Sequence, residues 1–317
     1  MASLFTLHPD IVEPAGGGPA GRQAKPPIFL RPMVTVDYHT DPACPWSWAA
    51  EASIRALMLE FGEDLEWRLV MGGLAREIAP EASPRAALPL AVRASLIEQW
   101  LQVSADTGAP LDPLTWAEGG IRSTYPACMA VRAAAEQGVE AAFAYLRRLR
   151  EGIMCERLKL DHAEALVEAA RQAGLDVERF RLGLRSHAIT EAFGADLEAT
   201  AALAAQQGER PPRSSAGSGG AALPTLVFAG DGGREIVSGL EPVDAYRRAA
   251  AACGGRRRDA RLDVEAVVRR FGRVTTGEVE TLCELPGPRA QAELWRLAEG
   301  WRLRPVRVLT GWLWEAA

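Results

Sequence analysis

Two short stretches near the start of the chain alternate apolar and polar residues, and a stretch of helical periodicity lies between them. Residues 34–38 and 65–71 carry the alternation and are rich in β-branched and bulky side chains, which predicts two buried strands. Apolar residues recur at helical spacing from Pro45 to Phe61, so a helix is expected there, with Gly62 as its stop signal. The order strand, helix, strand predicts a parallel pair joined by a right-handed crossover.

The middle of the chain has helical periodicity, and strand signals return after it. Helices are predicted near residues 88–104, 126–137, 140–152, 161–173, 177–184 and 187–207, and a further helix over 242–252. Asp161 is expected to cap the fourth helix, with Glu164 as its capping-box partner. A Ser-, Gly- and Ala-rich loop over 213–222 precedes two apolar stretches that flank a Gly-Asp-Gly-Gly turn, which predicts a β-hairpin.

The last 60 residues have a pattern of their own. Three predicted helices (264–271, 276–283 and 289–301) are followed by strand segments at 305–308 and 311–314, the layout of a winged helix-turn-helix. Thr276 is expected to cap the second helix. Leu294, Trp295, Leu297 and Trp301 are expected to form the core of this unit.

The chain is therefore expected to be an α/β protein in four parts. A Gly-, Ala- and Pro-rich segment, residues 1–30, is expected to be disordered. Residues 31–75 and 210–254 form the sheet domain, residues 76–209 its all-helical insertion, and residues 258–317 the winged-helix-like domain.

Composition excludes several classes of protein. Among the 317 residues, 48% are apolar and 24% charged, as in globular proteins with a sizeable core, and the net charge of −5 favours neither nucleic acid nor an acidic membrane. There is no run of about 18 apolar residues and no basic-then-apolar signal segment. The five cysteines are spaced irregularly, which predicts neither a disulfide framework nor a metal site. A cytoplasmic location without a membrane partner is expected.

The tail differs in charge from the rest. Residues 256–317 hold twelve Arg and nine Asp or Glu, an excess of three positive charges, which leaves −8 for the remainder. This supports a boundary near Gly254-Gly255. The excess is small for a DNA reader, so protein docking or dimerisation is the favoured role of the tail over nucleic-acid binding.

Cys44 holds the position in the sheet domain where chemistry is expected. It lies where a predicted parallel strand ends and a helix begins, the edge at which open α/β sheets bind ligands. Free N–H groups at the helix start would lower the pKa of the thiol, whereas the nearby Asp41 would oppose ionisation. Ser47 stands where a C-x-x-C motif has its second cysteine, so Cys44 could form a mixed disulfide but needs an outside thiol to resolve it. The alternative is that Cys44 is a buried small apolar residue.

Two other residues leave alternatives open. Pro224 could be an ordinary first residue of a strand or a cis-proline packed against the Cys44 loop. Cys128 could be buried in the insertion, or it could lie near Cys44 and act as the resolving thiol.

Three separated motifs resemble a known group of proteins. Asp41-Pro42-Ala43-Cys44-Pro45-Trp46-Ser47-Trp48 resembles the active-site loop of DsbA-type thioredoxin-fold proteins, in the branch of FrnE-like oxidoreductases, 2-hydroxychromene-2-carboxylate isomerases and kappa-class glutathione transferases. Residues 123–128 resemble the start of a helix in their inserted domain, and residues 224–226 resemble their cis-proline strand. The resemblance covers residues 34–252 and implies a thioredoxin fold. Members often carry a cysteine where this chain has Ser47, so dithiol chemistry is not implied.

The resemblance implies three functions. The first is a monothiol thiol–disulfide oxidoreductase in which Cys44, Ser47 and Pro224 are catalytic and Trp46, Trp48, Tyr125 and Leu223 bind the substrate, a protein disulfide or a small thiol. The second is an isomerase or transferase that uses glutathione or another low-molecular-weight thiol. The third is a non-catalytic adaptor, similar to thioredoxin-like proteins that bring a transcription regulator to a protease.

Overall fold

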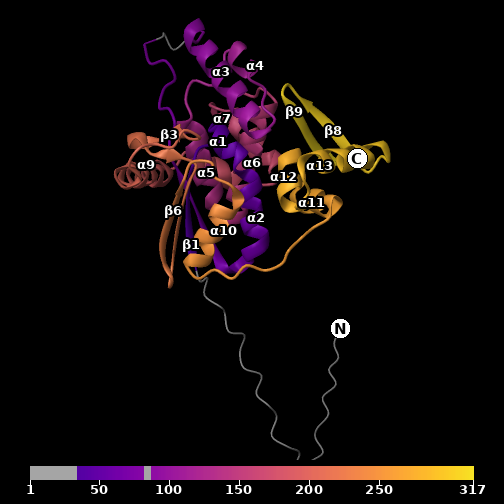
Figure 1. The fold of residues 1–317 in the computed structure, drawn as a ribbon. Coiled ribbons are helices and arrows are strands. Elements are labelled where there is room, and N and C mark those ends of the chain that lie inside the picture. Colours follow the sequence, from indigo (N-terminus) through magenta and orange to yellow (C-terminus); the bar gives the residue numbers. More distant parts are fainter. Residues whose placement is uncertain (1–33, 82–86) are drawn as a thin grey trace, which may run out of the picture. The chain divides into compact units, whose positions relative to one another are not determined.

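The computed structural model describes residues 34–81 and 87–317. The predicted disordered segment, residues 1–30, lies outside the described residues, so that prediction stands untested. The division into four domains also stays a prediction, although the elements follow each other in the expected order (Figure 1).

A four-stranded mixed sheet positions the Cys44 loop. Its strand order is β2 (Leu65–Met71), β1 (Val34–Thr40), β5 (Thr225–Gly230) and β6 (Gly233–Ser238). As the alternation predicts, β1 and β2 are parallel, and β5 and β6 form the predicted antiparallel hairpin. Strand β5 pairs antiparallel with β1, which brings the segment after the helical insertion next to the strand that leads into the Cys44 loop.

The helix predicted after the Cys44 loop is divided in two. The first part, α1 (Pro45–Ala49), has only five residues, and α2 (Glu51–Phe61) continues after Ala50. The Ala50 N–H bonds to Trp46 O, and Gly62 ends α2 with a positive φ, as the sequence indicates. Helix α10 (Val243–Ala252) packs beside α2 and β6.

The insertion is helical throughout its regular elements, as predicted. It consists of α3 (Leu90–Thr107), α4 (Leu114–Ala117), α5 (Tyr125–Ala135), α6 (Val139–Cys155), α7 (Ala163–Gln172), α8 (Val177–Leu184) and α9 (His187–Gln207). The predicted cap of α7 is wrong by one residue: His162 Nδ1 accepts the Ala165 N–H. Asp161 instead accepts the backbone N–H of Arg122. Its carboxylate is used by a residue 39 positions away, which local sequence cannot reveal.

The C-terminal part contains α11 (Val264–Phe271), β7 (Val274–Thr275), α12 (Thr276–Leu282), α13 (Gly287–Glu299), β8 (Leu303–Val308) and β9 (Gly311–Ala316). We call residues 264–317 the C-terminal unit. The three helices and the hairpin occur in the predicted order, and a short extra strand makes a sheet of order β7-β9-β8. The winged-helix interpretation of this unit stays a prediction.

Two expectations about the C-terminal unit are wrong. The cap of α12 is Thr275 rather than Thr276, and it forms a capping box with Glu278. Leu294 and Leu297 are buried and Trp295 is partly buried, but Trp301 is 87% exposed. Trp301 follows the end of α13 in the left-handed region, at φ 57°, so its side chain points away from the core that the helix builds.

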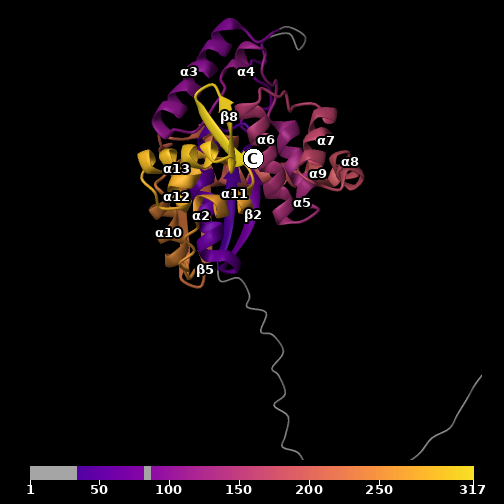
Figure 2. The same cartoon turned by 90° about the vertical axis from the view of Figure 1, so that its right-hand side faces the viewer.

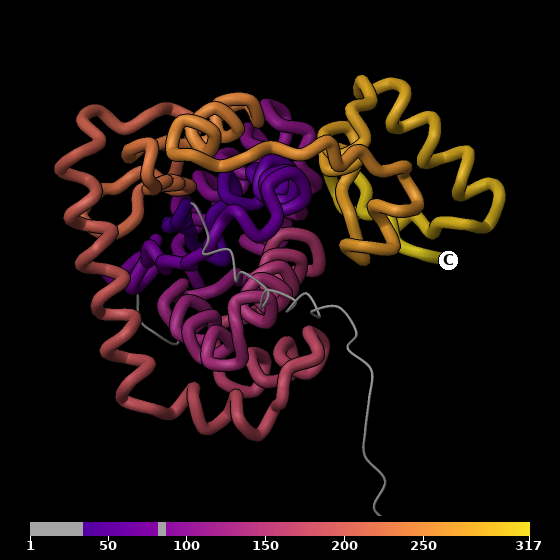
Figure 3. The backbone as a smooth tube through the Cα atoms, turned by 90° about the horizontal axis from the view of Figure 1, so that it is seen from below, coloured from indigo at the N-terminus to yellow at the C-terminus, as the bar shows by residue number. Residues whose placement is uncertain are grey.

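The C-terminal unit has its own small core, which also receives side chains from α2. Ala56 is part of that core, and Leu59 packs against it. Figures 1 and 2 show the unit beside α2 and α6, and Figure 3 shows the linker that reaches it from α10. Val308 and Leu313 of its hairpin are buried in the main core, so the unit shares apolar packing with the rest of the chain.

The left-handed position of Trp301 leads to a stability prediction. A side chain with a Cβ pays about 1 kcal/mol for this backbone region, which glycine adopts freely. Because the ring is exposed, its loss removes little packing. We expect Trp301→Gly to raise the free energy of unfolding by about 0.5–1 kcal/mol in urea titrations. The matched control is Gly108→Ala at the end of α3, where φ is 69°, the backbone is left-handed and an added Cβ meets no atom within 4 Å, so the variant should lose a similar amount. A Trp301→Gly protein that is less stable would contradict this explanation.

Candidate functional site

Asp41 organises the loop between β1 and Cys44. Its side chain is fully buried and accepts two backbone N–H groups at 2.8 Å, that of Ala43 at Oδ1 and that of Leu74 at Oδ2. The hydroxyl of Thr124, at 2.8 Å, and the thiol of Cys128, at 3.3 Å, donate to Oδ2. Four donors from three segments thus converge on one carboxylate and fix the backbone that presents Cys44.

The Cys44 thiol lies inside the protein. Its exposed fraction is 0%, and its Sγ is 3.6 Å from the carbonyl oxygen of Leu223. The Ser47 backbone N–H donates to the same sulfur at 3.3 Å, so Cys44 caps α1 through its own side chain. The Leu223–Pro224 peptide bond is cis. The structure therefore places Cys44, Ser47, Leu223 and Pro224 close together, and the catalytic role of Cys44, Ser47 and Pro224 stays a prediction.

The electrostatics of Cys44 differ from the expectation. Burial raises the pKa of the Cys44 thiol, and hydrogen bonds from Ser215 and Ser47 offset this only in part. Asp41 raises it further. The lowering expected from the helix start is present, through the Ser47 N–H bond to the sulfur, but burial outweighs it. A five-residue helix has a small dipole, whereas complete removal from water penalises the thiolate strongly.

Cys128 lies in α5 and bonds to Asp41. Burial and the Asp41 charge raise the pKa of its thiol well above the ordinary value. All five cysteines are buried and free. Cys128 is therefore buried, as one of the two alternatives expected. Its role as a resolving thiol stays a prediction.

A pocket of about 300 Å³ lies beside the Cys44 loop. Its apolar wall includes Leu96, Trp100 and Trp116, and its polar side includes Arg210 and residues 214–215. Ala43 and Pro45, the two neighbours of Cys44, line it, whereas Cys44 does not. A side chain or small molecule in the pocket would therefore lie next to the loop without touching the sulfur.

The four predicted substrate-binding residues do not line this pocket. Trp46 is buried below the Arg213 guanidinium, whose carbon lies 6.0 Å from the ring. Tyr125 packs edge-on against Phe193, and Leu223 is buried. Trp48 points toward α6, as described below. Their binding role stays a prediction.

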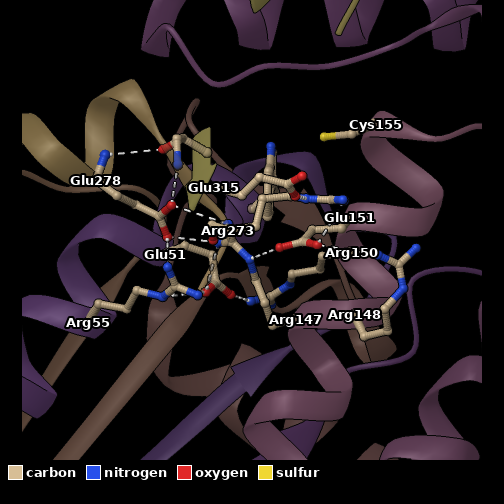
Figure 4. Close-up of polar contacts among 12 residues, drawn as sticks. Glu51, Arg55, Arg147, Arg148, Arg150, Glu151, Cys155, Arg273, Glu278 and Glu315 are labelled. Atoms are coloured by element: carbon tan, nitrogen blue, oxygen red, sulfur yellow. Dashed lines mark hydrogen bonds and ion pairs between the residues drawn. The ribbon is translucent and has the colours of Figure 1, made fainter. Parts of the chain in front are cut away.

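A buried cluster of ionic side chains was not foreseen from the sequence. Arg147 on α6 donates to Glu151 at 2.7 Å and to Glu278 of the C-terminal unit at 2.7 Å, and Glu278 also pairs with Arg55 on α2 (Figure 4). Arg150 on α6 pairs with Glu51 on α2. We call these six residues the ionic cluster. Arg147, Arg150 and Glu151 follow each other at helical spacing, which resembles a solvated face, so the sequence holds no signal of their burial.

The described residues contain neither a group of metal ligands nor a helix that could span a membrane. Over residues 34–81 and 87–317, His, Cys, Asp and Glu form no group that could hold a metal ion. Among the same residues, no helix has the length and apolar character needed to cross a membrane.

Comparison with known proteins identifies the class. A family model described as thioredoxin matches residues 38–208, more than half of the chain. The chain therefore belongs to this thioredoxin family, and its resemblance to DsbA-type thioredoxin-fold proteins is confirmed. The solved structure of the cytosolic disulfide reductase DsbM from Pseudomonas aeruginosa is similar in fold, with a TM-score of 0.51 and 21% identity. That match covers 68% of this chain and 97% of DsbM.

Relatives in sequence carry another name. The ClpXP adapter protein SpxH of Halalkalibacterium halodurans is 26% identical over 286 residues, which are 87% of this chain and 86% of that protein. SpxH of Bacillus subtilis is 27% identical over 165 residues, about half of each chain. The SpxH match covers 87% of this chain and the DsbM match 68%. Because the residues before the C-terminal unit make up less than 87% of the chain, the SpxH match includes part of that unit.

Proposed function

We propose that this protein is a non-catalytic adaptor that brings other proteins to a protease of the ClpXP type. The complete burial of Cys44 carries this proposal. A thiol that is absent from the surface and whose pKa is raised is a poor nucleophile, so the fold is better suited to presenting a binding surface. The adapter name of the SpxH relatives supports the same function.

The adaptor function implies a location and partners. We propose that the protein works in the cytoplasm, in keeping with its similarity in fold to the cytosolic disulfide reductase DsbM. Its partners would be the protease and a cargo protein. The C-terminal unit, a winged-helix-like domain in this proposal, would serve protein docking rather than nucleic-acid binding.

The adaptor function can be tested in cells. In a strain that lacks the gene, we expect at least one protein to have a longer half-life after protein synthesis is blocked, as measured by quantitative mass spectrometry. Wild-type and Cys44→Ala copies should both restore its degradation, because the thiol takes no part, and restoration should require ClpP. Cys253→Ala, at another buried cysteine, is the matched control. If Cys44→Ala fails to restore degradation while folding normally, the non-catalytic proposal is wrong.

A monothiol oxidoreductase is the second candidate, favoured by the pocket beside Cys44. In this reaction the Cys44 thiolate would attack a protein–glutathione disulfide, take the glutathione sulfur and release the protein thiol. A second glutathione thiolate would then attack the Cys44–glutathione disulfide and release oxidised glutathione. One solved structure of DsbM is with GSH, which makes glutathione the probe to use.

Turnover of a glutathionylated peptide distinguishes the two candidates. The adaptor proposal predicts the same rate with and without the protein, and calorimetry without glutathione binding. Turnover that Cys44→Ala abolishes would establish the oxidoreductase. The isomerase or transferase alternative, with glutathione or another small thiol as cofactor, stays a prediction that the same calorimetry addresses.

A further inference from the structure

Trp48 connects the Cys44 loop to distant parts of the chain. Its backbone N–H donates to Cys44 O at 3.0 Å, so the first turn of α1 joins the two residues directly. Trp48 is 2% exposed and does not line the pocket beside the loop. The backbone carbonyl and the sulfur of Cys44 both bond to α1, which couples the position of Cys44 to that of the helix that carries Trp48.

One face of the Trp48 ring is held by the ionic cluster. The Arg147 guanidinium carbon lies 4.4 Å from the ring centroid, in a buried cation–π contact. The same guanidinium donates to both carboxylate oxygens of Glu278, at 2.7 and 3.2 Å, and to Arg273 O at 3.1 Å. Arg273 and Glu278 both belong to the C-terminal unit. Arg147 is thus placed over Trp48 by residues that lie more than 120 positions later in the sequence.

The nitrogen of the Trp48 ring is held by a second route. Trp48 Nε1 donates to Pro110 O at 3.0 Å, and the next residue, Leu111, is fixed by the tip of the β8–β9 hairpin. Thr310 Oγ1 accepts the Leu111 N–H at 2.8 Å and the hydroxyl of Ser104 at 2.8 Å. Gly311 approaches Pro110 so closely that an added Cβ would lie 3.1 Å from the proline Cβ. The hairpin tip therefore sets the position of the loop that receives the Trp48 N–H.

We propose that the C-terminal unit clamps Trp48 through these two routes and thereby keeps the Cys44 loop closed, so that the Cys44 thiol becomes accessible only when the clamp releases. Ala43 and Pro45 already line the 300 Å³ pocket, so a small displacement of α1 would bring the sulfur to its wall. The C-terminal unit thus controls access to Cys44. This inference concerns access to the thiol and does not rest on the adaptor function.

The alkylation rate of Cys44 in the full chain tests the clamp. Thr310→Val keeps the shape of the side chain but removes the acceptor for Leu111 N–H and Ser104. We expect iodoacetamide to modify Cys44 about fivefold faster than in the wild-type protein, with rates for individual cysteines read by mass spectrometry. Thr281→Val is the matched control: Thr281 is also in the C-terminal unit, but it donates to Gly277 O within its own helix. Its Cys44 rate should be that of the wild-type protein.

Two results with Thr310→Val would overturn the clamp. One is an unchanged Cys44 rate in Thr310→Val. The other is an equal acceleration at Cys44 and at Cys253, which would report general unfolding instead of release of one loop. A second variant, Trp48→Phe, keeps a ring over Arg147 but loses the N–H to Pro110. Coupling between two sites is reciprocal. Trp48→Phe should therefore speed hydrogen exchange of the Leu111 amide as well as Cys44 alkylation, and faster alkylation without faster exchange would also contradict the clamp.

Discussion

Arg147→Met should lower the free energy of unfolding by about 3–5 kcal/mol, the cost of breaking a buried ion pair by removing one partner. The Arg147 side chain is 10% exposed and that of Glu278 1%, so water cannot replace the lost guanidinium. Methionine preserves much of the aliphatic volume, so the loss is one of charge and hydrogen bonds rather than of packing. The midpoint of urea unfolding should fall while the slope of the transition stays the same.

The control for Arg147→Met is an ion pair at the surface. Arg304 pairs with Glu315, but the Arg304 side chain is 66% exposed. Exposed pairs contribute about 0–1 kcal/mol because water screens them. We expect Arg304→Met to change the stability by less than 1 kcal/mol. If the two variants lose equal stability, the burial of the ionic cluster is not what makes Arg147 important.

Asp196 should make the protein less stable as the pH rises from about 4 to about 6. Burial raises the pKa of its carboxyl to about 6, although Arg132 and the Met71 N–H favour the charged form. Between the unfolded and folded pKa values, the folded state holds the proton that the unfolded state has already lost. The contribution of Asp196 is therefore full below pH 4 and is lost as the pH rises through 6, by about 3 kcal/mol in total.

Asp196→Asn isolates this contribution, because the amide oxygen can still accept the Met71 N–H and does not titrate. The stability of the variant relative to the wild type should increase between pH 4 and pH 7 in urea titrations. Asp244→Asn is the opposite control: Arg247 lowers the pKa of Asp244, so the wild type should lose its relative advantage as the pH falls. If the difference in unfolding free energy between the wild type and Asp196→Asn does not vary over this pH range, Asp196 is ionised throughout it.

The strands around the site could be predicted because their signals are local. Alternation over residues 34–38 and 65–71 reflects one buried and one less buried face, and the turn before residue 235 carries its own glycines. The position of Cys44 at the end of β1 follows from these elements alone. The predicted helix cap is wrong where a distant residue binds the capping side chain. The Asp161 carboxylate accepts the Arg122 N–H instead of capping α7.

The state of the site could not be predicted for the same physical reason. A cysteine at a helix start is reactive or inert according to how completely other segments cover it, and the carbonyl that faces Cys44 belongs to Leu223, 179 positions later. The burial of Arg147 likewise depends on Glu278, 131 positions away. Periodicity indicates which face of a helix is polar, but it does not indicate that another unit covers that face with opposite charges.

During synthesis, Trp48 is made well before the residues of the C-terminal unit that hold it in the folded protein. Cys44 and Trp48 leave the ribosome long before Arg273, Glu278 and Thr310 are added. At roughly 5–20 residues per second, Thr310 follows Trp48 by on the order of 13–52 s. During that interval the loop lacks the contacts that close it in the finished protein. Under the proposed clamp, the growing chain is therefore the form in which small oxidants and electrophiles reach this thiol most readily, until the C-terminal unit has folded.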